Sequence, residues 1–126
     1  MSFEGNEFAS ILAIIHSLIS GPDLPVPLRE HCLAQRGNKF YVIGGNSGGT
    51  KLDTVYIYDF STYPSATYET GPALNLGRIS HGCATLDDGT IVVAGGDSGS
   101  GRTNTVEILL DGSSSWVSSK SILQVG

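Results

Sequence analysis

The chain has 126 residues, the size of one domain, and 40% of them are hydrophobic. Twelve acidic and seven basic residues give a net charge of −5 at pH 7. This excludes nucleic-acid or membrane binding that works through a basic surface. The longest apolar run, Ile11 to Ile15, is far shorter than the roughly 18 residues of a membrane span. Glycine is frequent, with 17 residues, and charged residues are sparse at 15%, which predicts short strands and many turns.

The first segment of the chain, residues 1–20, is apolar and precedes the repeats described below. Its apolar residues from Phe8 to Ile19 recur at spacings of three and four, which predicts a short amphipathic helix. A strand remaining from an upstream unit is the alternative, because isoleucine is β-branched and favours strands. A cleaved signal peptide is a further alternative. It is disfavoured because Glu4 and Glu7 occupy the region where such signals carry positive charge.

From residue 21 to residue 126 the chain contains an internal repeat with an offset of about 51 residues. The segment from His31 to Gly45 superimposes on the segment from His81 to Gly96 with one inserted residue. The run from Thr54 to Asp59 matches the run from Thr105 to Asp111 at the same offset. We therefore expect two complete units, about 29–78 and 78–126, with the ends of two flanking units.

Each unit contains four strand-like runs separated by turn signals. They are Cys32–Gln35, Phe40–Ile43, Thr54–Asp59 and Ala66–Thr70 in the first unit, and Cys83–Leu86, Thr90–Ala94, Thr105–Leu110 and Ser115–Ser118 in the second. The pairs Gly37-Asn38 and Asp88-Gly89 are typical of hairpin turns, and loops Asn46–Asp53 and Asp97–Asn104 join the second run to the third. The second runs are apolar on both faces and need cover on both sides. The prediction is an all-β fold, a partial β-propeller of two four-stranded antiparallel blades.

The same residues resemble kelch repeats. The resemblance rests on the double glycines after the second runs, the strand Val55-Tyr-Ile-Tyr-Asp59, an aromatic residue near each fourth run and the Arg-x-x-His of Arg78 to His81. It implies a propeller with more blades than this chain holds, and a binding role more often than catalysis. We therefore expect a fragment of a larger propeller, or a chain that self-associates through uncovered blade faces.

His31, Cys32, His81 and Cys83 are residue types that bind zinc. Because they are repeat-equivalent, they should lie on neighbouring blades, and packed sheets are about 10 Å apart. That spacing argues against a zinc site and against a Cys32–Cys83 disulfide, which needs Cα atoms within about 7 Å. We expect two buried free thiols, histidines bonded to neighbouring backbone, and neither a metal nor a cofactor.

Candidate binding residues lie in the loops and connections that a meander places at one end of the blades. They are Arg29, Arg78, Arg102, His31, His81, Asn46 and Asp97. An arginine there can bind a carboxylate of a partner or brace its own blade. The three arginines predict a locally positive face and an anionic peptide partner, with a glycan as the alternative.

No cluster of catalytic residues stands out, and the sequence predicts a non-catalytic protein-interaction or scaffolding module. One alternative is a fragment of a propeller enzyme resembling galactose oxidase, whose copper site gathers tyrosine, histidine and cysteine. Another is a substrate adaptor of a ubiquitin ligase, as the kelch resemblance also implies.

Overall fold

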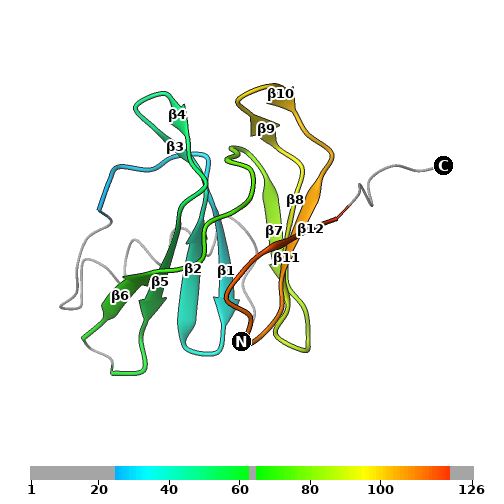
Figure 1. The fold of residues 1–126 in the computed structure, drawn as a ribbon. Coiled ribbons are helices and arrows are strands. Elements are labelled where there is room, and N and C mark those ends of the chain that lie inside the picture. Colours follow the sequence, from blue (N-terminus) through cyan, green and yellow to red (C-terminus); the bar gives the residue numbers. More distant parts are fainter. Residues whose placement is uncertain (1–24, 63–64, 120–126) are drawn as a thin grey trace.

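The computed structural model describes residues 25–62 and 65–119, and within these residues the chain forms strands and turns. Two four-stranded antiparallel sheets stand side by side (Figure 1). Their spatial orders are β1-β2-β5-β6 and β7-β8-β11-β12, so each sheet is a meander interrupted only by a small hairpin. No helix in the described ranges is long and apolar enough to cross a membrane. The segment 1–20 and the terminal residues after Ser119, for which we made predictions, lie outside the described residues.

The eight main strands coincide with the eight predicted runs to within one or two residues. In the first blade they are β1 (Cys32–Arg36), β2 (Lys39–Ile43), β5 (Val55–Asp59) and β6 (Thr67–Thr70); in the second they are β7 (Gly82–Thr85), β8 (Ile91–Ala94), β11 (Val106–Leu109) and β12 (Val117–Ser119). Gly37 and Asn38 form the two-residue turn between β1 and β2, since Arg36 pairs with Lys39. The prediction of two antiparallel blades is confirmed.

Two small hairpins were predicted only as loops. They are formed by β3 (Asn46–Ser47) with β4 (Thr50–Lys51), and by β9 (Asp97–Ser98) with β10 (Gly101–Arg102). Strands of two residues carry no hydrophobic alternation that a sequence pattern could reveal. Both hairpins project from the same end of the blades, the top in Figure 1.

The main hydrophobic core lies between the two sheets. It contains Ala34, Tyr41, Ile43, Val55 and Ile57 of the first blade and Ile91, Val93, Leu109 and Trp116 of the second, with Leu74 from the connection. Burying a side chain of this size contributes about 1.5–3 kcal/mol. Trp116 also donates its indole N–H to the carbonyl of Pro72 at 2.8 Å. Trp116 thus packs between the blades.

The blades pack front to back. Tyr41 and Ile57 of the first blade face the second blade, but their repeat equivalents, Val92 and Ile108, lie on the opposite face of their own sheet from Val93. Such a head-to-tail contact uses two different surfaces, so the contact surface of the first blade recurs on the outer face of the second. There Val92 and Ile108 are half-buried, and neighbouring Val117 is 56% exposed.

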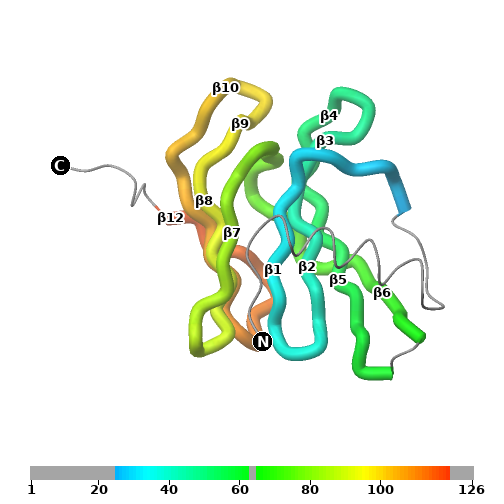
Figure 2. Tube along the Cα trace, turned by 180° about the vertical axis from the view of Figure 1, so that it is seen from behind, coloured from blue at the N-terminus to red at the C-terminus, as the bar shows by residue number. Residues whose placement is uncertain are grey.

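A disulfide joins Cys32 of β1 to Cys83 of β7, which corrects our expectation of two free thiols. The Cα atoms are 6.1 Å apart, within the range of a disulfide. The expectation was wrong because the 10 Å spacing describes the middle of packed sheets. The first strands of the two blades instead lie directly beside each other (Figure 2), where the sheets approach most closely.

Candidate interaction surface

The end of the blades that carries the two small hairpins also carries the connections entering β1 and β7; we call it the upper end. Backbone hydrogen bonds fix each connection to the hairpin of its blade. The N–H of Arg29 donates to the carbonyl of Asn46 at 3.1 Å, and the N–H of Asn46 donates back at 2.7 Å. Ile79 and Asp97 exchange the equivalent pair at 2.9 Å each. The upper end is therefore a set of segments held to a common scaffold.

The double glycines make room for these connections. A Cβ on Gly45 would lie 2.8 Å from the Cβ of His31, and a Cβ on Gly96 would lie 2.5 Å from the carbonyl oxygen of Ile79. Gly44 faces the following blade instead, where a Cβ would lie 2.8 Å from the carbonyl oxygen of Arg78. All three also have positive φ, a conformation that costs a side-chain-bearing residue energy. Gly44 and Gly45 thus pack against different blades.

Arg78, a predicted binding residue, is completely buried. It donates to the carbonyls of Gly95 and Thr105 at 2.9 and 3.0 Å and forms a 2.9 Å ion pair with Glu107, which is 1% exposed. The Glu107 carboxylate also accepts hydrogen bonds from two backbone N–H groups of residues 75 and 76. Arg78 therefore braces its own blade, because its buried guanidinium cannot contact a partner.

Arg29, which occupies the position of Ile79 in the first connection, is exposed. Its side chain is 75% accessible and lies 3.7 Å from the Glu30 carboxylate. Glu30 also accepts a hydrogen bond from Ser80 Oγ at 3.1 Å, while the backbone N–H of Ser80 donates to the Glu30 carbonyl at 2.8 Å. Glu30 and Ser80 are the described non-glycine residues with positive φ, at 60° and 54°. Such strained backbone persists where the surroundings fix it, and here the two connections fix each other.

The two histidines lie beneath these connections. His81 is buried and its Nε2 lies 2.8 Å from the carbonyl oxygen of Ile43, at the end of β2 in the other blade. Burial lowers the pKa of His81 and of the half-buried His31. The hydrogen bond agrees with the expected contact to neighbouring backbone. His81 therefore links the blades rather than facing a partner.

A lysine that sequence reasoning missed joins the two hairpins. Lys51 donates to the Asp97 carboxylate at 3.1 Å and to the Ser98 carbonyl at 2.8 Å. One oxygen of the Asp97 carboxylate is therefore bound by Lys51, although the Asp97 side chain is 42% exposed. Asn46, at the equivalent position of the first hairpin, uses its Oδ1 to accept the N–H of Gly49 at 2.9 Å.

The repeat offset contains the signal for Lys51. Residues 51 and 102 are repeat equivalents and both are cations, so a comparison of hairpin positions would have found the pair. Arg102 is exposed at the end of β10. The structure thus places Arg29, Asn46, Asp97 and Arg102 on the upper end, and it keeps Arg78 and His81 inside. Within the described ranges there is no group of three or more histidines, cysteines or acidic residues that could hold a metal ion.

Two antiparallel four-stranded sheets that stack front to back, with their first strands side by side, are blades of a β-propeller. Residues 27–63 match the family model of the Kelch motif, a segment that runs from the first connection through β5. This segment is similar to a kelch repeat, as the resemblance had indicated. Kelch repeats usually form non-catalytic modules that mediate protein–protein interactions. No curated protein sequence matches the chain.

Proposed function

We propose that the chain is a non-catalytic interaction module that binds an acidic peptide segment of a partner protein at its upper end. The contact between Lys51 and Asp97 carries this proposal. It demonstrates the chemistry of the hairpin position: a cation there binds a carboxylate and a carbonyl group of an adjoining segment. Arg102 occupies the equivalent position of the second hairpin and is exposed.

Charge and rigidity support the same proposal. Arg29 is mostly exposed beside the first hairpin, so the upper end offers two accessible guanidinium groups, which bind carboxylates in a bidentate geometry. The segments that carry them are fixed by backbone hydrogen bonds to Asn46 and Asp97. A preordered loop loses little conformational entropy on binding.

The test is selection of a random peptide library on the immobilised full chain. We expect enrichment of peptides with several Asp or Glu residues, bound with an affinity that decreases with salt. The double variant Arg29→Ala/Arg102→Ala should weaken a selected peptide by about tenfold or more, equal to about 1.4 kcal/mol. The matched control is Lys39→Ala, which removes a cation from the opposite end of the blades. Unchanged affinity of the double variant, or selected peptides without acidic residues, would refute the proposal.

A further inference from the structure

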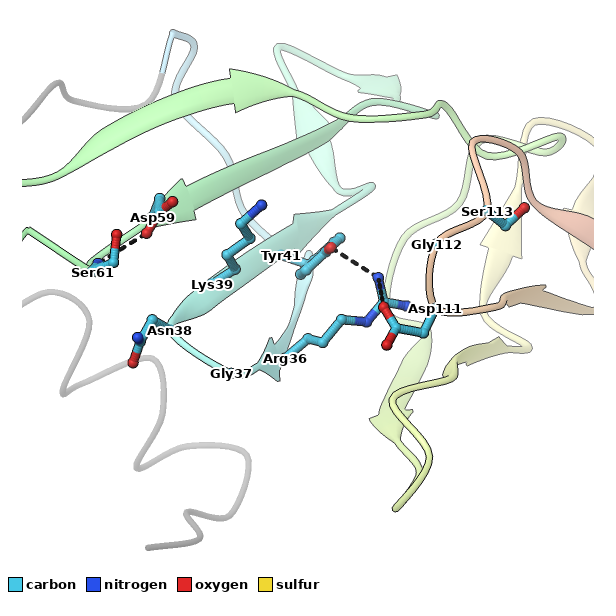
Figure 3. Close-up of a pocket in the computed structure, with 10 residues that line it drawn as sticks. All are labelled: Arg36, Gly37, Asn38, Lys39, Tyr41, Asp59, Ser61, Asp111, Gly112 and Ser113. Atoms are coloured by element: carbon cyan, nitrogen blue, oxygen red, sulfur yellow. Dashed lines mark hydrogen bonds and ion pairs between the residues drawn. The ribbon is translucent and has the colours of Figure 1, made fainter.

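A polar crevice lies between the two blades at the end opposite to the hairpins (Figure 3). Its volume is about 720 Å³. The β1–β2 turn, the residues around the end of β5 and the turn between β11 and β12 form its walls. It is separate from the upper end, so its function would be additional to the one proposed above.

Arg36 fixes the geometry of the crevice by joining the blades. Its guanidinium donates to the carbonyls of Gly89 and Leu109 in the second blade at 2.7 and 3.1 Å. It also donates to the Tyr41 hydroxyl at 3.0 Å and lies 5.2 Å from the centre of the Tyr41 ring. Because the Tyr41 oxygen accepts this bond, its own hydrogen is available to donate to a ligand.

The charges in the crevice are balanced but incompletely paired. Lys39 faces Asp59 across the β2–β5 ladder and interacts with it electrostatically, yet its ammonium group forms no hydrogen bond or ion pair within residues 25–62 and 65–119. The Asp111 carboxylate lies 3.7 Å from Arg36, beyond hydrogen-bond distance, and is 64% exposed. Two cations and two carboxylates thus line one space. The Lys39 ammonium on one wall has no hydrogen-bond partner among the described residues, and the Asp111 carboxylate on the other wall forms only a long ion pair with Arg36 and is mostly exposed.

The presence of two cations and two carboxylates favours one class of ligand over the others. A simple anion would meet Asp59 and Asp111, and a simple cation would meet Lys39 and Arg36, so neither gains from the crevice as a whole. A sugar would need an aromatic face to stack on, but the Tyr41 ring is 5% exposed and covered by Arg36. A molecule that carries both charges offers a hydrogen-bonding partner to Lys39 and to Asp111 without a net charge penalty.

We propose that this crevice binds a small zwitterion of the amino-acid type. Its carboxylate lies between the Lys39 ammonium and the Tyr41 hydroxyl, which project from the same face of β2 two residues apart. Its ammonium lies beside Asp111 on the opposite wall. The Asp59 carboxylate, held by the N–H of Ser61 at 2.9 Å, borders the site and excludes a second anion.

The test is a titration of the full, isotope-labelled chain followed by amide NMR shifts, with glycine, β-alanine and γ-aminobutyrate as probes at constant ionic strength. We expect saturable shifts in the β1–β2 and β11–β12 turns, and an affinity that peaks at one charge separation. Lys39→Gln and Asp111→Asn should each weaken the best probe by about tenfold, equal to about 1.4 kcal/mol. Both side chains reach solvent, so both variants should keep the wild-type spectrum away from the crevice.

Acetate, methylammonium and glucose are the matched probes that carry one charge or none. Equal binding of acetate would overturn the proposal in favour of an anion site, and saturable binding of glucose in favour of a sugar site. Absence of saturable shifts with all three amino acids would also overturn it. Lys51→Gln, which removes a cation from the upper end, is the control variant and should leave the titration unchanged. Because it uses other residues and other probes, this test fails or succeeds independently of the peptide selection.

Discussion

The two connections that enter the blades have equivalent backbones but different side-chain roles. Arg78 is fully buried and paired with Glu107, whereas the equivalent position of the first connection is Leu28, which packs against the cluster of Val42, Tyr56 and Tyr58. The third main strand of each blade, β5 in the first and β11 in the second, explains the difference. The repeat equivalent of Glu107 in β11 is Tyr56 in β5. Without a carboxylate at that position, a buried guanidinium would carry an uncompensated charge. The repeat therefore fixes where the chain runs, and the residue on the facing strand decides whether the connection carries an ion-paired arginine or an apolar leucine.

Removing the buried carboxylate should have the largest effect. Glu107→Gln leaves Arg78 buried without its counter-ion, and breaking such a pair costs about 3–5 kcal/mol. Arg29→Met, which replaces the exposed arginine of the first connection, should change the free energy of unfolding by less than about 0.5 kcal/mol. Urea unfolding of the full chain measures both. Similar losses in the two variants would show that burial does not distinguish the two arginines.

The glycine positions sharpen the comparison, because they depend on the backbone and not on the arginine side chains. Gly45→Ala and Gly96→Ala should each destabilise the chain by about 1–3 kcal/mol through overpacking against the connections. The loss should be similar in the two blades. Gly48→Ala is the control, since it shares the positive φ but has open space around it, and should cost less. Urea unfolding measures both losses of stability. Unequal losses at the two equivalent glycines would show that the two connections do not have equivalent backbones.

The smallest predicted effect concerns pH. Burial lowers the pKa of His31 and His81 in the folded chain, so the unfolded chain binds protons more readily. The histidines should therefore contribute their full share to the free energy of unfolding above the ordinary histidine pKa near 6.5. This contribution should decrease as the pH falls through that value toward the lowered pKa values. Urea midpoints at about pH 7.5 and about pH 5.5 measure the change. His81→Gln should reduce it more than His31→Gln, because His81 is the more buried; a rise in stability with acid would contradict this account.

Much of the fold was predictable because its signals are local. The hairpin pair Gly37-Asn38 and the doubly apolar second strands each specify one blade without reference to the other, and the offset of about 51 residues shows that the blade recurs. The features that were missed depend on how the blades meet. The Cys32–Cys83 disulfide and the contact between Lys51 and Asp97 cross from one repeat to the next, so they require the spacing of β1 and β7 at their closest approach. The charge lining of the crevice likewise combines turns that are about 70 residues apart in sequence.

The disulfide between β1 and β7 changes what a protease can release from this chain. Cys32 and Cys83 enclose the rest of the first blade and the connection to the second. A single cut anywhere between them leaves two pieces that are still covalently joined, and they would migrate together on a gel until a reductant is added. A nicked molecule would therefore keep its blades at a high effective concentration, so that they can re-dock after local opening.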